Sequence, residues 1–157
     1  VERKQIEYDY KFEKVFEAIE SKDIEPDKGI FFDGQIFDAY SFISNLVRSA
    51  KKEIILLDNY VDDTVLTLFI KRKEGVKVTT LTKEITKQLK LDLEKYNSQY
   101  PKLNITKLKS SHDRFLIIDD QTYHFGASLK DLGKRWFSFS KFDKELSMLL
   151  SNKLNPE

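Results

Sequence analysis

The chain contains no cysteine among its 157 residues. This absence excludes disulfide bonds, thiolate metal sites and cysteine nucleophiles. Only two histidines, His112 and His124, are present, too few for a histidine-rich metal cage within one chain. No apolar run reaches the roughly 20 residues that cross a bilayer, and no signal-peptide pattern appears. We therefore expect a cytoplasmic protein with no metal, no cofactor and no membrane anchor.

The charge of the chain is unevenly distributed, although its formal net charge is only +1. Residues 1–33 hold six Lys and Arg against ten Asp and Glu, a balance of −4. Residues 34–157 hold 21 against 16, a balance of +5. A mildly basic body permits a polyanionic partner such as DNA or RNA, although an ordinary solvated surface explains the same charges.

Hydrophobic patterning divides the chain into an N-terminal segment, residues 1–28, and a folded domain, residues 29–157. Apolar side chains in residues 7–21 follow helical spacing, and a polar connector with Pro26 comes next. The N-terminal segment is thus expected to be an amphipathic helix with a connector. Because the sequence starts at Val1 rather than Met, we expect this segment to be a linker from an upstream domain.

Strands and helices alternate in the folded domain, and a hairpin with one further strand and a closing helix follows. This order predicts an α/β sandwich with a mixed sheet. The predicted strands are residues 29–34, 53–60, 76–82, 103–108, 115–118, 122–125 and 136–142, and the predicted helices are residues 36–47, 62–73 and 84–98 and a segment after Asp143.

One segment carries a pattern typical of phosphate chemistry. His112, Arg114 and Asp119 have the spacing H-x-R-x4-D, and Gly126 follows at D-x6-G. Side chains two positions apart on a strand point to the same face, so His112 and Arg114 can face one spot. A guanidinium binds phosphoryl oxygens at two points, and an imidazole can attack phosphorus or move a proton. The alternative is a strand in which both residues merely pair with surface carboxylates.

The pattern resembles the motif of the phospholipase D superfamily, H-x-K-x4-D-x6-G-S-x-N, over roughly residues 30 to 152. The resemblance implies a phospholipase D-like α/β/α sandwich with a mixed sheet and a metal-independent phosphodiesterase, most plausibly a nuclease. It makes His112 the nucleophile that forms a phosphohistidine and Arg114 the phosphate-binding cation. It gives Asp119 and Gly126 structural roles.

A second histidine is needed for that mechanism, and the chain carries one motif. Single-motif members of the superfamily pair two copies across a two-fold axis, which is an isologous arrangement. The resemblance therefore implies a homodimer. His124 does not start a second motif, because no H-x-[KR] pattern follows it. It either lines the same cleft or is a packed strand histidine, and we favour packing.

The sequence departs from the family pattern at the residues after the glycine. Arg114 replaces the family lysine, and Ala127 and Leu129 stand where the family has serine and asparagine. Ser128 could compensate as a catalytic and phosphate-binding residue, with Lys130 as a further phosphate ligand. These departures weaken the inference from phosphate binding to turnover.

Carboxylates outside the motif have two possible roles. The family uses a downstream carboxylate to orient its histidine, and Glu145 is our catalytic candidate, although spacing does not decide between it and Asp143. Asp58, Asp62 and Asp63 follow the first core strand, where α/β proteins place ligands. They could bind a metal, but helix capping is the favoured interpretation.

A narrower resemblance bears on function. Residues 31–66 and 112–143 look like the C-terminal half of bacterial proteins that carry a phage-antirepressor-type or RhuM-like DNA-binding domain at their N-terminus. The chain would then be a non-catalytic phosphate- and nucleic-acid-binding dimerisation module of a DNA-binding regulatory protein, which is the alternative to a nuclease. Basic residues after the motif could follow a nucleic-acid backbone, namely Lys130, Lys134 and Arg135. We favour a core or interface role over base stacking for Phe31, Phe32, Trp136, Phe137 and Phe139.

Overall fold

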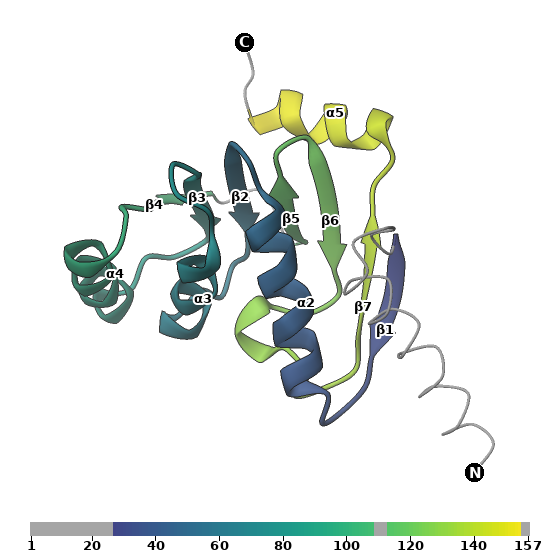
Figure 1. Ribbon diagram of the computed structural model, residues 1–157, viewed down its shortest axis with the longest axis horizontal. Coiled ribbons are helices and arrows are strands. Elements are labelled where there is room, and N and C mark those ends of the chain that lie inside the picture. Colours follow the sequence, from purple (N-terminus) through teal and green to yellow (C-terminus); the bar gives the residue numbers. More distant parts are fainter. Residues whose placement is uncertain (1–26, 109–112, 155–157) are drawn as a thin grey trace.

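A computed structural model describes residues 27–108 and 113–154 of the chain. Within these residues a seven-stranded sheet has the strand order β1-β7-β6-β5-β2-β3-β4 (Figure 1). The predicted helix at residues 7–21 and the motif residue His112 lie outside the described residues. The strands are β1 (Lys28–Phe31), β2 (Glu53–Leu57), β3 (Lys77–Thr82), β4 (Asn104–Lys107), β5 (Arg114–Ile118), β6 (Gln121–Phe125) and β7 (Phe137–Lys141), and the helices are α2 (Ile36–Ser49), α3 (Asp63–Leu68), α4 (Lys87–Gln99) and α5 (Lys144–Leu154), with short 3₁₀ turns η1 (Phe69–Lys71) and η2 (Leu129–Asp131).

The sheet has a parallel part and an antiparallel part. Strands β2, β3 and β4 run parallel, as crossover helices α3 and α4 require. Strand β5 pairs antiparallel with β2, and β6, β7 and β1 follow as antiparallel neighbours. This arrangement confirms the predicted mixed α/β sheet and the predicted β5–β6 hairpin. Strand β4 is one edge of the sheet and β1 is the other.

Alternation along the strands gives the sheet two different faces. Leu56, Leu116 and Tyr123 are buried in one hydrophobic core with the apolar side of α2, and we call this side the α2 face. Ile55 and Ile117 point to the other side, where they line a groove with α5, and we call this the α5 face. None of the described helices is long and apolar enough to cross a membrane.

Helix α2 confirms its sequence prediction, and its N-terminus supports a loop that matters for the site. The carbonyl oxygen of Gly133 accepts a hydrogen bond of 3.0 Å from the N–H of Gly34, just before α2. Gly133 has φ +78°, and a Cβ there would lie 2.4 Å from the Cα of Ile36. Only glycine satisfies both conditions, so the loop around η2 packs directly on the start of α2.

Asp62 and Asp143 cap the helices α3 and α5. The Asp62 carboxylate accepts a hydrogen bond of 3.0 Å from the N–H of Thr64 in α3. The Asp143 carboxylate accepts one of 2.8 Å from the N–H of Leu146 in α5. The capping predicted for Asp62 is confirmed, and Asp143 caps the closing helix in the same way. In the described part of the chain, no three His, Asp or Glu side chains are grouped to hold a metal ion.

Asp119 ties the β5–β6 turn to the start of β2. Its carboxylate accepts hydrogen bonds from the backbone N–H groups of Lys51 (3.0 Å), Lys52 (2.8 Å) and Glu53 (3.0 Å). Its φ of +56° lies in the left-handed region, which Asp and Asn tolerate better than most residues. Slight burial raises the pKa of Asp119, but these N–H groups and the Lys52 charge outweigh it, so its pKa lies below the ordinary value.

We predict that Asp119→Ala lowers the free energy of unfolding by about 2 kcal/mol at neutral pH, because three backbone donors lose a charged acceptor. Asp119→Asn should lose less, since it keeps an acceptor and tolerates the backbone conformation. Because the pKa of Asp119 is depressed in the fold, its contribution is complete above its unfolded pKa and is lost as the pH falls through the folded value. Urea unfolding from neutral to acidic pH should therefore show the gap between wild type and Asp119→Ala closing.

Asp120 is the matched control for this experiment, since it is exposed in the same turn. Asp120→Ala should unfold like the wild type. Equal losses for the variants at both positions would mean that the turn, and not the Asp119 contacts, carries the stability.

Candidate functional site

The motif residue Arg114 begins β5, at the end of the sheet where β2 finishes. We call this end of the sheet the Arg114 edge. Leu57 pairs with Phe115 in the antiparallel register of β2 and β5. Continuing that register by one position beyond the end of β2 would bring Asp58 opposite Arg114, and the Arg114 charge is among the influences that lower the pKa of Asp58. Alternation puts both side chains on the α2 face, together with Leu56 and Leu116. The end of β6 lies at the same edge, since Arg114 also pairs with Phe125.

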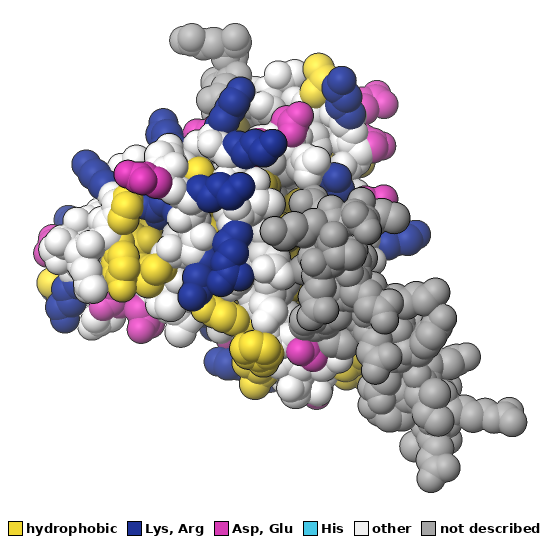
Figure 2. Space-filling model, in the orientation of Figure 1, with side chains coloured by type: hydrophobic (Ala, Val, Ile, Leu, Met, Phe, Trp, Pro, Cys, Tyr) yellow, Lys and Arg dark blue, Asp and Glu magenta, His cyan; other side chains and the backbone are white. Residues whose placement is uncertain are grey.

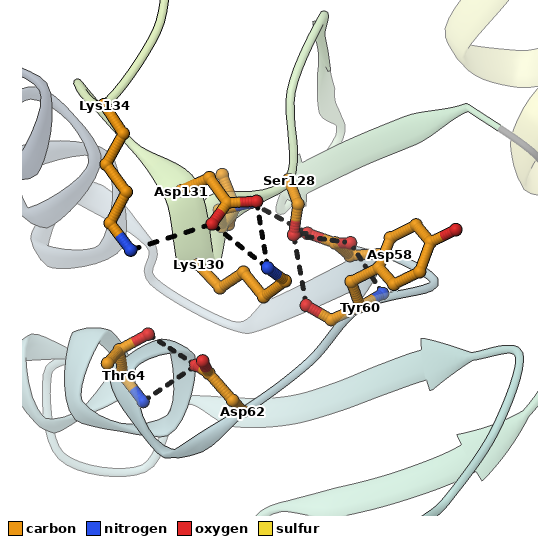
Figure 3. Close-up of polar contacts among 9 residues, drawn as sticks. Asp58, Tyr60, Asp62, Thr64, Ser128, Lys130, Asp131 and Lys134 are labelled. Atoms are coloured by element: carbon orange, nitrogen blue, oxygen red, sulfur yellow. Dashed lines mark hydrogen bonds and ion pairs between the residues drawn. The ribbon is translucent and has the colours of Figure 1, made fainter.

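A buried carboxylate organises this edge. Asp58 is only 1% exposed. Its carboxylate lies 2.9 and 3.0 Å from the hydroxyl oxygen of Ser128 and accepts a bond of 2.9 Å from the N–H of Leu129. It also accepts one of 3.0 Å from the N–H of Tyr60, whose carbonyl oxygen is 3.1 Å from the Ser128 hydroxyl (Figure 3). We call Asp58, Tyr60, Ser128 and Leu129 the Asp58 clasp.

Burial of the clasp disfavours the charged form of Asp58, and its hydrogen bonds oppose this effect. Burial raises the pKa of Asp58 above its ordinary value of 3.8. The N–H groups of Leu129 and Tyr60, the Ser128 hydroxyl and the Arg114 charge oppose this rise without cancelling it. A buried carboxylate is tolerated only when it is hydrogen-bonded and charge-compensated. Arg114 therefore provides compensating charge beside the clasp.

The residues after Gly126 are engaged within the protein. The Ser128 side chain is buried, and its hydroxyl has Asp58 as its acceptor. Lys130 forms an ion pair of 3.0 Å with Asp131, and Lys134 approaches the same carboxylate at 3.8 Å (Figure 3). The roles of Ser128 and Lys130 as phosphate ligands stay predictions, and each would require one of these contacts to be exchanged for a ligand contact.

Gly126 lies at the end of β6, and its N–H donates a hydrogen bond of 2.9 Å to the carbonyl oxygen of Ser138 on the next strand. A Cβ on Gly126 would meet Ser138 atoms at 3.5 Å, which is ordinary contact. The glycine therefore marks the exit from β6, and its own surroundings do not require the absence of a side chain.

His124 lies away from Arg114, on the α5 face. Its ring stacks near Phe142 and contacts Phe115, with ring centroids 6.1 and 5.3 Å away. One ring nitrogen is 3.8 Å from the Asp113 carboxylate. The favoured prediction, a packed strand histidine, is confirmed.

Glu145 is not brought to the Arg114 edge. It is exposed in the first turn of α5, and α5 follows the end of β7 where Lys141 pairs with Tyr123 near the β5–β6 turn. That turn is at the edge opposite Arg114. Asp143 lies there as well and caps α5. Within the described part of the chain, neither candidate carboxylate reaches Arg114, so the proposed catalytic role of Glu145 has no support from its position.

The groove beside α5 lies at this opposite edge as well. It is lined by residues such as Asp119, Gln121 and Ser147 and does not include Arg114 or Asp58. This groove therefore includes the motif residue Asp119 but lies apart from Arg114 and Asp58.

The principal site residue that sequence reasoning missed is Asp58. Its place after a core strand allowed a metal site and favoured helix capping, and the structure instead gives it Ser128 and Leu129 as partners. Ser128 and Asp58 are 70 positions apart in the sequence. The only available signal in the sequence was an acidic residue after an apolar strand. The partners of Asp58 could not be predicted, because they come together only through the pairing of β2 with β5.

Comparison with known proteins bears on the fold. No family model matches the chain, and no curated protein matches it in sequence. Solved structures do resemble it, and with them the sheet order and the motif strand identify the fold as phospholipase D-like. NucT from Helicobacter pylori is 14% identical with a TM-score of 0.61, over 82% of this chain and 93% of NucT.

Two further structures share the fold. TrmBL2, described as an archaeal chromatin protein with a novel mode of DNA binding, is 18% identical with a TM-score of 0.57, over 99% of this chain and 62% of TrmBL2. Phosphatidylserine synthase from Haemophilus influenzae is 20% identical with a TM-score of 0.55, over 80% of this chain and 36% of the synthase. The chain thus spans under two thirds of both proteins. At these identities the likeness shows the fold alone.

We predict that Ser128→Ala lowers the free energy of unfolding by about 2 kcal/mol, because it leaves the buried Asp58 carboxylate without one of its donors. Urea denaturation at neutral pH measures the loss. Ser151→Ala is the matched control, since Ser151 is exposed on α5, and it should change stability by less than about 0.5 kcal/mol. Similar values for both variants would show that the clasp contributes little.

Proposed function

We propose that the chain is a phospholipase D-like domain that binds the phosphate backbone of nucleic acid at the Arg114 edge without hydrolysing it. The Asp58 clasp carries this proposal. Phosphodiester cleavage needs hydrogen-bond donors that are free to follow the charge developing on phosphorus. Here the hydroxyl of Ser128 and the N–H of Leu129 are both bound to Asp58, so the donors after Gly126 are committed to the fold.

Binding, in contrast, needs only cations at a suitable surface. Arg114 supplies a planar guanidinium that suits a phosphate. Figure 2 shows Lys and Arg side chains gathered in a band on the side of the molecule that carries α2 in Figure 1. Such a band attracts a polyanion. The DNA binding stated for TrmBL2, a structure that covers 99% of this chain, supports the same class of partner.

A homodimer is part of the proposal. Two copies related by a two-fold axis would present two Arg114 edges to one nucleic acid and would make binding tighter than a single copy allows. The proposal also includes an upstream DNA-binding domain that residues 1–28 connect, and a cytoplasmic location. The solution mass of the protein tests the dimer directly.

A second candidate is a metal-independent nuclease, which the H-x-R-x4-D-x6-G spacing favours. In that case His112 attacks phosphorus and forms a phosphohistidine as the P–O bond to the leaving group breaks. The same histidine of a second copy protonates the leaving oxygen and then activates the water that hydrolyses the P–N bond. The fold shared with NucT is compatible with this chemistry.

The binding prediction is that Arg114→Ala weakens affinity for a labelled DNA oligomer roughly tenfold and lowers the salt slope by about one phosphate contact. Fluorescence anisotropy at several salt concentrations measures both. Lys90→Ala on α4 is the matched control, since Lys90 is an exposed cation on another part of the surface. Equal affinity for wild type and Arg114→Ala would place the binding site elsewhere.

The cleavage prediction separates the two candidates. We expect the dimer to leave DNA, RNA and a model phosphodiester intact in the presence of a chelator. Product formation that survives the chelator and disappears in His112→Ala would establish the nuclease and refute the non-catalytic proposal. Gel analysis of labelled oligomers and release of a chromogenic leaving group give the two readouts.

A further inference from the structure

Tyr60 presents an exposed ring on a fixed backbone. The residue is 58% exposed. Its N–H donates to Asp58 at 3.0 Å, and its carbonyl oxygen lies 3.1 Å from the Ser128 hydroxyl. Both neighbours are buried. The clasp therefore holds the main chain of Tyr60, while the side chain points outward.

The ring is available to a ligand. In Figure 3 it extends from the clasp on the side away from Lys130 and Lys134. Among the described residues, no ring contact or side-chain hydrogen bond involves the Tyr60 ring. An exposed aromatic ring on a fixed backbone offers binding surface at little conformational cost. Its exposure thus suits a flat ligand better than an internal packing role.

Tyr60 lies next to the position proposed for phosphate. Asp58 directly follows Leu57, which pairs with Phe115, the sequence neighbour of Arg114, and the Arg114 charge acts on the Asp58 carboxylate. Tyr60 follows two residues later, which adds at most about 7 Å along the chain. One nucleotide spans a distance similar to the length of chain from Asp58 to Tyr60. A phosphate on Arg114 would bring an adjoining base within reach of the ring.

We propose that Tyr60 stacks on a nucleobase adjacent to the phosphate held by Arg114, so that the site prefers single-stranded over duplex nucleic acid. This inference rests on the proposed function and adds the substrate class. Bases within a duplex are already stacked and paired, whereas unpaired bases offer a free face to an aromatic side chain. Stacking of this kind tolerates any base sequence.

Trp136 provides a matched control within the same chain. It is 65% exposed and lies in the loop just before β7. It packs edge-on against Phe32, with ring centroids 4.9 Å apart. Trp136→Ala therefore removes an exposed aromatic ring without touching the clasp.

The experiment compares three labelled probes of one length by fluorescence anisotropy: oligo(dT), an abasic oligomer with the same number of phosphates, and a DNA duplex. Wild type should bind oligo(dT) roughly tenfold more tightly than the abasic oligomer. Tyr60→Ala should abolish this difference, and Tyr60→Phe and Trp136→Ala should keep it. Urea denaturation should show that Tyr60→Ala folds normally, since the side chain is 58% exposed and the clasp holds Tyr60 through its backbone.

The probes distinguish failure of this inference from failure of the proposed function. If Tyr60→Ala keeps the preference for oligo(dT), the inference is overturned, while Arg114-dependent binding of the abasic oligomer would still support phosphate binding. If wild type binds none of the probes, both proposals are overturned. If Tyr60→Ala converts a dimer into a monomer, the ring belongs to a subunit interface and the stacking role is overturned.

Discussion

The antiparallel pairing of β2 with β5 joins the two parts of the sheet. On one side lie the parallel strands β3 and β4, and on the other lie the antiparallel strands β6, β7 and β1. An aspartate stabilises each end of this pair. Asp119 binds the N–H groups before and at the start of β2, and Asp58 at the end of β2 binds the segment that follows β6. The register of one strand pair therefore fixes both the hairpin turn and the candidate site.

The two aspartates, Asp119 and Asp58, differ in their surroundings, and this difference affects the pKa of each carboxyl group. Asp119 lies near the surface, where hydrogen bonds keep its carboxylate ionised. Asp58 is buried and has the Arg114 charge nearby. The pKa of the two carboxyl groups therefore shifts in opposite directions, below the ordinary value for Asp119 and above it for Asp58.

Much of the fold could be predicted from the sequence because it depends on local patterns. Apolar periodicity located α2, the core strands and the hairpin, and Asp62 and Asp143 preceded helices as capping residues should. Helix α3 is shorter than predicted and ends in the 3₁₀ turn η1, since periodicity alone does not show where a helix tightens. The predicted strand of residues 53–60 ends earlier, at Leu57, because the N–H of Tyr60 donates to the Asp58 side chain and the chain turns there.

The candidate site was harder to predict because its contacts are non-local. The motif located Arg114 and Asp119, but nothing in the local pattern connects Asp58 with Ser128. Spacing could not decide between Asp143 and Glu145 for a related reason: sequence distance from the motif gives no information on which end of the sheet a residue occupies. The predicted core aromatic residues also differ in their burial. Phe31, Phe137 and Phe139 are core residues, whereas Trp136 is exposed, since strand alternation is interrupted in the loop before β7.

The open edge of the sheet at β4 constrains how two copies could associate. An edge strand has unpaired backbone N–H and C=O groups that could extend the sheet into a second molecule. Asn104, Thr106 and Lys107 are exposed along β4, and polar and cationic side chains of this kind discourage such strand addition. A continuous sheet through β4 is therefore a poor route to a dimer. Self-association that leaves β4 unpaired has to use other surfaces of the molecule.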